Sequence, residues 1–320
     1  MAWLVTMVSQ GGKTTSGAKR KAELTAGLYI VATPIGNLKD ITYRAVEVLK
    51  SADAIACEDT RHTAKLCEAY GISTPRLAYH DHNGAHIRPH ILERLESGQA
   101  IALVSDGGTP LISDPGYKLV RDAHLADIPV KTIPGASAAI AALSIAGLAS
   151  DQFLFAGFAP SKSGQRTSYF EKLKEIQATL IFYEAPSRVA QTLQAMAKSF
   201  GARDVVVARE LTKTYETQVK GNLSELDPLM EAITFKGEFV ILIAPPQSVT
   251  ASQEVIDAML LTHLEKMSVK EAASETAKAL NMPRREAYGR ALALKKTVAN
   301  PYGAPPSIQP AKSTAPRAHR

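Results

Sequence analysis

The sequence of 320 residues is 45% hydrophobic and 21% charged, which is enough apolar material for one large or two ordinary packed domains. This composition excludes a chain that is disordered throughout. The mean hydropathy is −0.06 and no segment approaches the ~18 consecutive apolar residues of a membrane-spanning helix, which excludes an integral membrane protein. The net charge is +6 at pH 7, and only two cysteines are present. With no signal-peptide pattern in the first residues, we expect a cytoplasmic protein that does not associate with membranes.

The positive charge is concentrated at the two ends of the chain. Residues 1–21 have a net charge of +4, residues 261–320 of +7, and residues 22–260 of −5. Such basic ends favour attraction to a polyanion, although basic tails that only aid solubility are an alternative. We expect residues 1–26 to form a basic, flexible N-terminal segment and residues 299–320, rich in Pro, Ala and Ser, to form a disordered tail.

From Gly27 onward, short apolar runs alternate with amphipathic stretches, a pattern typical of an α/β domain with a largely parallel sheet. Five strands and four connecting helices predict a doubly wound sheet. The strands are expected at 28–32, 54–57, 76–79, 100–104 and 130–133, and the helices at 43–50, 63–70, 86–96 and 118–126.

A second sheet-based unit is predicted after a hinge near Ser150 and Asp151. An alanine-rich helix at 137–148 precedes the hinge, and its small residues would allow close packing on a sheet or another helix. We therefore expect two α/β domains, residues 27–149 and 150–246. The second has strands predicted at 153–158, 179–183, 205–208 and 239–244 and a helix at 188–200.

A small helical domain is predicted over residues 254–298. Ser268 and Glu271 form a capping-box pattern for a helix that runs to Leu280, and a basic helix over 284–294 follows a break at residues 281–283. Helix, short turn and basic helix is the outline of a helix-turn-helix. The alternative is a helical hairpin that docks on the rest of the chain or on a second subunit.

Polar or glycine-bearing loops follow all five predicted strands of the first domain. Open parallel sheets bind ligands at the carboxyl ends of their strands, so these loops predict a ligand cleft at one edge of the sheet. They span residues 33–37, 58–62, 80–83, 105–116 and 134–138.

Two familiar phosphate-binding motifs are not supported. Residues 11–15 read GGKTT, but Met7 stands where a P-loop needs its first glycine, and no G-x-G-x-x-G follows any predicted strand. In the loop 106–110, by contrast, Gly107 and Gly108 allow backbone to approach a ligand, while Asp106 and Thr109 offer an acceptor and a hydroxyl. This loop would suit a nucleoside-sized cofactor, although a turn built for geometry alone has similar residues.

Seven segments of the chain resemble the tetrapyrrole-methylase superfamily and, within it, the ribosomal RNA small subunit methyltransferase I family. The resemblance extends over about residues 27–246 with the segments in order, and the helical pair at 268–294 is similar to the family's small C-terminal domain. Gly107 stands where the family would have alanine. The segments are 28–38 (LYIVATPIGNL), 58–63 (EDTRHT), 79–83 (YHDHN), 105–116 (SDGGTPLISDPG), 182–184 (FYE), 208–213 (ARELTK) and 236–240 (KGEFV).

The resemblance implies a fold, a cofactor and a reaction. Two α/β domains of the tetrapyrrole-methylase type would hold S-adenosylmethionine in the cleft between them, and the methyl group would pass to the ribose 2′-hydroxyl of a decoding-centre cytidine in 16S rRNA of the small ribosomal subunit. A homodimer is also implied. The residues expected to bind the cofactor are Pro34, Gly36, Asp106, Gly107, Gly108, Thr109, Pro110, Ser137, Ala138, Tyr183, Ala208, Gly237 and Glu238.

Methyl transfer to an alcohol needs alignment of the hydroxyl oxygen with the methyl group and removal of the hydroxyl proton. Imidazoles and carboxylates in the loops after the second and third strands are candidates to accept that proton. Basic or amide side chains are candidates for contacts with RNA. The catalytic candidates are His80, His82, Arg61, Asp59 and His62. The candidates for substrate binding are Arg61, Asn83, Lys213, Arg284, Arg285 and Arg290.

Two other functions are consistent with parts of the sequence. Five histidines within a short stretch could ligate a metal ion and support a metal-dependent hydrolase; they are His62, His80, His82, His86 and His90. A noncatalytic RNA-binding protein on a methylase scaffold is the other alternative, although no aromatic-rich RNA-stacking motif favours it.

Overall fold

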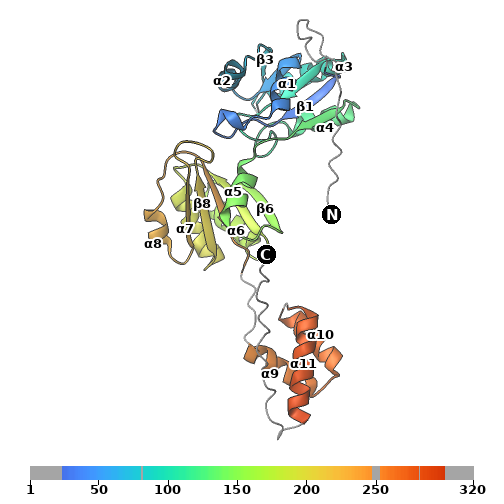
Figure 1. Cartoon of the computed structure of the whole chain (residues 1–320), viewed down its shortest axis with the longest axis vertical. Helices are drawn as coiled ribbons and strands as arrows, with labels where there is room; N and C mark the ends of the chain where they lie inside the picture. Colours follow the sequence, from blue (N-terminus) through green and yellow to red (C-terminus); the bar gives the residue numbers. More distant parts are fainter. Residues whose placement is uncertain (1–23, 81, 247–252, 281, 300–320) are drawn as a thin grey trace, which may run out of the picture. The chain divides into compact units, whose positions relative to one another are not determined.

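The computed structural model describes residues 24–80, 82–246, 253–280 and 282–299. The chain divides into two compact units, with the division between Pro246 and Gln247. We call residues 24–246 the body and residues 253–299 the helical unit, and describe each by itself (Figure 1). Apart from residues 24–26 and 299, the predicted flexible N-terminal segment and disordered tail lie outside the described residues.

The first sheet of the body is entirely parallel, with the strand order β3-β2-β4-β1-β5. All five predicted strands are present, with ends within one residue of those predicted. They are β1 (Gly27–Val31), β2 (Ala54–Cys57), β3 (Arg76–Ala78), β4 (Ala100–Leu103) and β5 (Val130–Ile133).

Helices cover both faces of this sheet, which confirms the doubly wound prediction. Ile55 and Cys57 face α1 (Tyr43–Ser51) and α2 (Thr60–Tyr70), whereas Ala56 faces α3 (Gly84–Glu96) and α4 (Tyr117–Leu125). Because the inner strands β1, β2 and β4 are buried on both faces, they are continuous apolar runs. A single 3₁₀ turn, η1 (Leu38–Asp40), follows the β1 loop.

The second sheet is mixed, with the order β6-β7-β10-β8-β9. Only β6 and β7 are parallel; the other pairs are antiparallel. Its strands are β6 (Phe153–Phe158), β7 (Thr179–Glu184), β8 (Asp204–Arg209), β9 (Thr217–Asn222) and β10 (Phe239–Ile243). The sequence analysis missed β9, because this edge strand reads TQVKGN and lacks a clear apolar alternation.

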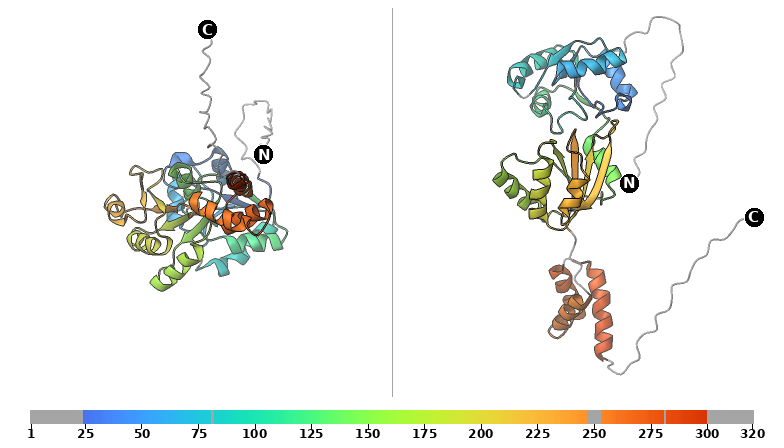
Figure 2. Two further views of the ribbon diagram at one scale, coloured as in Figure 1. Left: turned by 90° about the horizontal axis from the view of Figure 1, so that it is seen from below. Right: turned by 90° about the vertical axis from the view of Figure 1, so that its left-hand side faces the viewer.

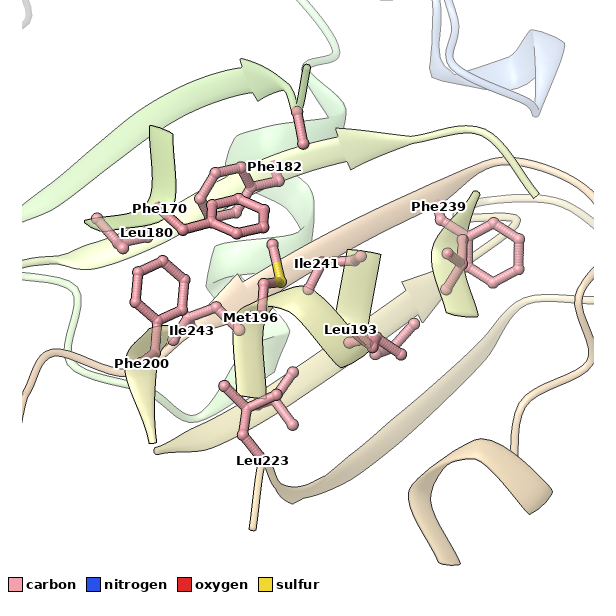
Figure 3. Packing of buried hydrophobic residues seen from close by; sticks show 14 of the residues in the cluster. Phe170, Leu180, Phe182, Leu193, Met196, Phe200, Leu223, Phe239, Ile241 and Ile243 are labelled. Atoms are coloured by element: carbon pink, nitrogen blue, oxygen red, sulfur yellow. The ribbon is translucent and has the colours of Figure 1, made fainter. Parts of the chain in front are cut away.

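Three helices cover one face of the second sheet: α6 (Ser163–Leu173), α7 (Val189–Phe200) and α8 (Leu226–Glu231). Figure 3 shows Phe170 of α6 and Met196 of α7 packed among strand residues such as Phe182. Each fully buried aromatic or aliphatic side chain of this kind stabilises the fold by about 1.5–3 kcal/mol. The sequence analysis did not predict α6 or α8.

Helix α5 (Ala138–Ala146) covers the opposite face of the second sheet. In the right-hand view of Figure 2, α6 and α7 lie on one side of the yellow strands and the green α5 lies on the other. Ala139, Ala142 and Ala146 are buried against strands β7, β8 and β10. By packing, therefore, α5 belongs to the second sheet, although the boundary predicted near residue 150 put it in the first domain.

The helical unit is a bundle of three helices, α9 (Gln253–Leu264), α10 (Val269–Ala279) and α11 (Arg284–Ala299). The predicted capping box is confirmed: Ser268 Oγ accepts the amide of Glu271, and the Glu271 carboxylate accepts the amide of Ser268. Small residues such as Ala273 and Ala287 form the core with Leu260. Across the described residues, no helix is both long and apolar enough to cross a bilayer.

Candidate functional site

A cavity of about 810 Å³ lies in the body between the carboxyl ends of the first sheet's strands and one end of the second sheet. The loops after β1 and β4, which are neighbouring strands, form much of its wall, and the chain leaves these two strands in opposite directions toward β2 and β5. Such a switch point is where open α/β sheets bind ligands. Of the predicted cofactor residues, those that line the cavity are Pro34, Gly36, Asp106, Gly107, Gly108, Thr109, Ser137, Ala138, Tyr183, Gly237 and Glu238.

The loops after β1 and β4 are joined by a short backbone bridge. Thr33 N donates to Gly108 O at 2.9 Å, and Gly108 N donates to Thr33 O at 3.0 Å. Gly108 has φ +91°, a conformation that favours glycine. A Cβ on Gly107 would lie 3.3 Å from the Pro34 carbonyl oxygen, so bare backbone forms this wall. The Thr109 hydroxyl donates to the Ala136 carbonyl at 3.1 Å, which ties the β4 loop to the segment before α5.

Asp106 links the β4 loop to the β2 loop. Its Oδ1 accepts the backbone amide of Asp59 at 3.2 Å. Asp59 in turn caps α2 by accepting the Arg61 amide, and its carboxylate pairs with the Arg61 guanidinium at 2.9 Å. These bonds to Arg61 lower the pKa of Asp59 to about 2. Because this cap starts α2 at Thr60 rather than at the predicted residue 63, Arg61 and His62 lie in the helix.

The structure does not bring all of the predicted catalytic residues to the cavity. His62 lines it, but Asp59, Arg61, His80 and His82 do not. The Arg61 side chain is 89% exposed. A carboxylate held by Arg61 at so low a pKa is a weak proton acceptor, so the geometry argues against the predicted catalytic role of Asp59.

The segment after β3 is a local turn closed by Asn83. The Asn83 side chain accepts the His80 amide at 2.9 Å and donates to the Ala78 carbonyl at 3.0 Å, which uses its amide for structure rather than for the predicted RNA contact. The rings of His80 and His82 are 6.0 Å apart at their centroids. Within the described ranges, no three His, Cys, Asp or Glu side chains come together as a metal site, so the histidine arrangement does not support the hydrolase alternative.

The second sheet contributes the β7–α7 connection to the cavity wall. Glu184 is buried and accepts hydrogen bonds from the Ala185 amide at 2.9 Å and the Thr192 hydroxyl at 2.7 Å, and its carboxylate is 3.2 Å from Arg188 Nε. Next to it, the Tyr183 hydroxyl accepts the Ala139 amide at 3.1 Å, and burial raises the Tyr183 pKa. These bonds fix the wall to α5 and α7.

The loop after β8 crosses to the loop after β1. Glu210 and Thr212 have φ of +51° and +65°, and the Thr212 hydroxyl accepts the Asn37 amide at 3.0 Å. Lys213 Nζ lies 2.9 Å from carboxylate oxygens of both Glu210 and Glu238. Lys213 lines the cavity, but its ammonium group is already paired with two carboxylates of the body.

Gly36 is required for the close approach of these loops, because a Cβ there would lie 2.8 Å from the Leu211 carbonyl oxygen. Two predicted cofactor residues lie behind the wall instead of lining the cavity. Ala208 is fully buried against α5, and Pro110 is also buried. The structure therefore argues against direct cofactor contacts by these two side chains.

Asp114 lines the cavity, and the sequence analysis did not single it out. Its carboxyl is half-buried and receives a hydrogen bond from Ser105. Burial, followed by the charges of Glu58 and Asp106, raises the pKa of Asp114 to about 6. The sequence could have identified Asp114 as a candidate site residue, because it lies in the segment 105–116 that carries the family resemblance.

The chain is similar to known proteins over most of its length. The profile of the family described as Tetrapyrrole (Corrin/Porphyrin) Methylases matches residues 27–227, and that of the RsmI C-terminal HTH domain matches residues 250–295. The ribosomal RNA small subunit methyltransferase I of Mesorhizobium japonicum is 48% identical, covering 86% of this chain and 94% of the relative. The protein of the same name from Bacillus subtilis is 43% identical, covering 82% and 92%.

Solved structures support the fold of the body. The uroporphyrin-III-C-methyltransferase of Thermus thermophilus is 19% identical with a TM-score of 0.51, covering 68% of this chain and 93% of that structure. A diphthine synthase is 17% identical with a TM-score of 0.55, covering 68% and 89%. At such identities the likeness concerns the fold alone.

Proposed function

Since this chain belongs to the ribosomal RNA small subunit methyltransferase I family, an S-adenosylmethionine-dependent group of the tetrapyrrole methylases, we propose that it methylates the ribose 2′-hydroxyl of a decoding-centre cytidine in 16S rRNA. The substrate would be the small ribosomal subunit. The homodimer and the cytoplasmic location implied by the sequence remain predictions.

The observation that carries this proposal is the cavity where the predicted cofactor loops meet. Its volume of about 810 Å³ is within the range of small-molecule sites. The backbone at Gly107 and Gly108 and the hydroxyls at Ser137 and Tyr183 provide groups that could hold a nucleoside and an amino acid moiety. These features fit S-adenosylmethionine, which supplies an electrophilic methyl group when bound.

The residues of the body would then contribute to methyl transfer mainly by positioning the hydroxyl and the methyl group. The bridge between Thr33 and Gly108 and the bond from Asp59 to Asp106 hold the β1, β2 and β4 loops at fixed separations. Preorganised loops of this kind reduce the entropy lost when a hydroxyl and a methyl group are aligned for reaction.

The proposal is tested by methylation of small ribosomal subunits that lack the modification. We expect the full chain, given S-adenosylmethionine with a labelled methyl group, to label the ribose of one cytidine in 16S rRNA, and not to label subunits that already carry this methyl group. Nuclease mapping and mass spectrometry of nucleosides would locate the label. Label on a base or on a ribosomal protein, or no label at all, would contradict the proposal.

The helical unit provides a second prediction, concerning RNA affinity. Arg284 and Arg285 are exposed at the start of α11. Arg290, also predicted to bind RNA, instead pairs with Asp257 of α9 (Nε to Oδ1, 2.6 Å), which lowers the pKa of Asp257. Replacing Arg284 and Arg285 with Gln should weaken binding to the subunit and reduce the slope of log affinity against log salt by about 1–2.

The control is Arg290→Gln, which removes one positive charge from the same helix. Because Arg290 joins α11 to α9, this variant should lower the melting temperature of the helical unit. Filter binding at several salt concentrations and circular dichroism distinguish the two effects. If the double variant binds subunits with wild-type affinity and salt dependence, these two arginines do not contact RNA.

A further inference from the structure

The segment between β4 and α4 has an unusual backbone at the cavity wall. Leu111 and Ser113 have φ of +75° and +65°, although residues other than glycine rarely adopt positive φ angles. Ser113 also approaches Gly157 of β6: a Cβ on Gly157 would lie 3.4 Å from the Ser113 hydroxyl, and the register of β6 shifts at this point. Strained residues persist where the surrounding structure holds them, and they are frequent at active sites.

This backbone places Asp114 on the cavity wall. It lies near Ser105 and Asp106 of the β4 loop, Glu58 of the β2 loop and Tyr183 of β7. The other titratable groups that line the same cavity are His62, Lys65, Lys213, Glu184 and Glu238. None of these groups shifts the pKa of Asp114; the charges that do so are the carboxylates of Glu58 and Asp106.

We infer that the Asp114 carboxylate is the proton acceptor for the ribose hydroxyl during methyl transfer, an inference that rests on the proposed function. Asp114 takes up the proton that the hydroxyl loses. The hydroxyl oxygen forms the new bond to the methyl carbon, and the bond from sulfur to that carbon breaks with its electron pair kept by sulfur. Protons and electrons balance without a metal ion or a further reactant.

Asp114 combines the two properties that this step needs. A carboxyl with a pKa of about 6 is ionised at neutral pH and is a stronger base than an ordinary carboxylate. Among the predicted alternatives, Asp59 is paired with Arg61, and neither His80 nor His82 lines the cavity. His62 does line it and is the competing candidate.

The test compares Asp114→Asn with His62→Asn and with the control Asp151→Asn, an exposed aspartate between α5 and β6. The full chain is mixed in excess with unmodified subunits and labelled S-adenosylmethionine, and the single-turnover rate is followed from pH 5 to 8.5. We expect Asp114→Asn to lower the rate by about 10²–10⁴-fold. The rate of Asp151→Asn should stay near that of the wild type, and His62→Asn should retain the wild-type dependence of the rate on pH.

Further measurements distinguish proton transfer from a structural role. The wild-type rate should fall below about pH 6, where Asp114 becomes protonated, and the residual rate of Asp114→Asn should lack this acid limb. Calorimetry should show nearly unchanged affinity of Asp114→Asn for S-adenosylmethionine. Its melting temperature at pH 8 should equal or exceed that of the wild type, because a carboxyl whose pKa is raised by folding is destabilising once ionised. Asp114→Glu should recover part of the rate and the acid limb.

Several results would overturn the inference. A wild-type rate in Asp114→Asn, or a large loss of cofactor affinity in that variant, would remove Asp114 as the proton acceptor. If the Asn variant does not fold, a wild-type rate that is independent of pH between 5 and 8 would have the same consequence. In each of these cases wild-type protein still labels 16S rRNA, so the proposed function stands; absence of label with wild-type protein would overturn both.

Discussion

Replacing Asp106 with alanine should weaken the binding of S-adenosylmethionine by about 1–3 kcal/mol, roughly 5- to 150-fold in Kd. Asp106 lines the cavity, and its Oδ1 accepts the Asp59 amide at 3.2 Å. The substitution removes a charged acceptor from the wall and also releases the β2 loop. Isothermal titration calorimetry with the full chain measures the change.

The first sheet provides a matched control at the amino ends of its strands. Asp53, before β2, also accepts one backbone amide, that of Ala100 at 2.8 Å, but it does not line the cavity. Asp53→Ala should therefore lose a comparable hydrogen bond while keeping wild-type cofactor affinity. If the Asp53 and Asp106 variants bind the cofactor equally well, Asp106 has no role in its binding.

Replacing Glu184 with alanine should lower the free energy of unfolding of the body by about 3–5 kcal/mol, because it breaks a buried ion pair and leaves its partners without an acceptor. The Glu184 side chain is fully buried and accepts hydrogen bonds from Ala185 and Thr192 while it pairs with Arg188. Urea unfolding followed by circular dichroism measures the loss.

Thr192→Val is the control for this prediction. It removes only the hydroxyl that donates to Glu184 at 2.7 Å and should cost about 1–3 kcal/mol, since one carboxylate oxygen then lacks a donor. Equal losses in the two variants would indicate that the ion pair with Arg188 adds nothing beyond this hydrogen bond. A Glu184→Ala variant as stable as the wild type would show that the buried carboxylate does not stabilise the β7–α7 connection.

Local sequence was sufficient to predict most of the fold. The inner strands β2 and β4 of the first sheet are buried on both faces, so each appears as an uninterrupted apolar run, at 54–57 and 100–103. Caps and turn residues also act locally, which is why the capping box at Ser268 was predicted correctly. In contrast, the edge strand β9 and helices α6 and α8 have weak periodicity, because polar residues and Gly164 interrupt their apolar faces.

The candidate site was predicted as a set of loops but not as a set of interacting groups. The glycines of the β4 loop and the end of β1 were identified because turn chemistry is local. The pairing of Lys213 with Glu210 and Glu238, of Arg290 with Asp257, and of Asn83 with its own turn depends on which side chains meet after folding. These three side chains are therefore occupied within the protein, although their residue types favour RNA contacts.

The sequence by itself determined most strands of the two sheets, the helical unit and the family, because burial pattern, caps and long motifs depend on neighbouring residues. The tertiary structure decided which sheet α5 covers, which loops meet across the cavity and that Asp114 lies on its wall. The hydrogen bond between Asn37 and Thr212 joins residues 175 positions apart, and a separation of this kind leaves no local pattern. Contacts of that range arise only when the packing of two sheets brings their loops together, and the same packing removes Asp114 partly from water and raises its pKa.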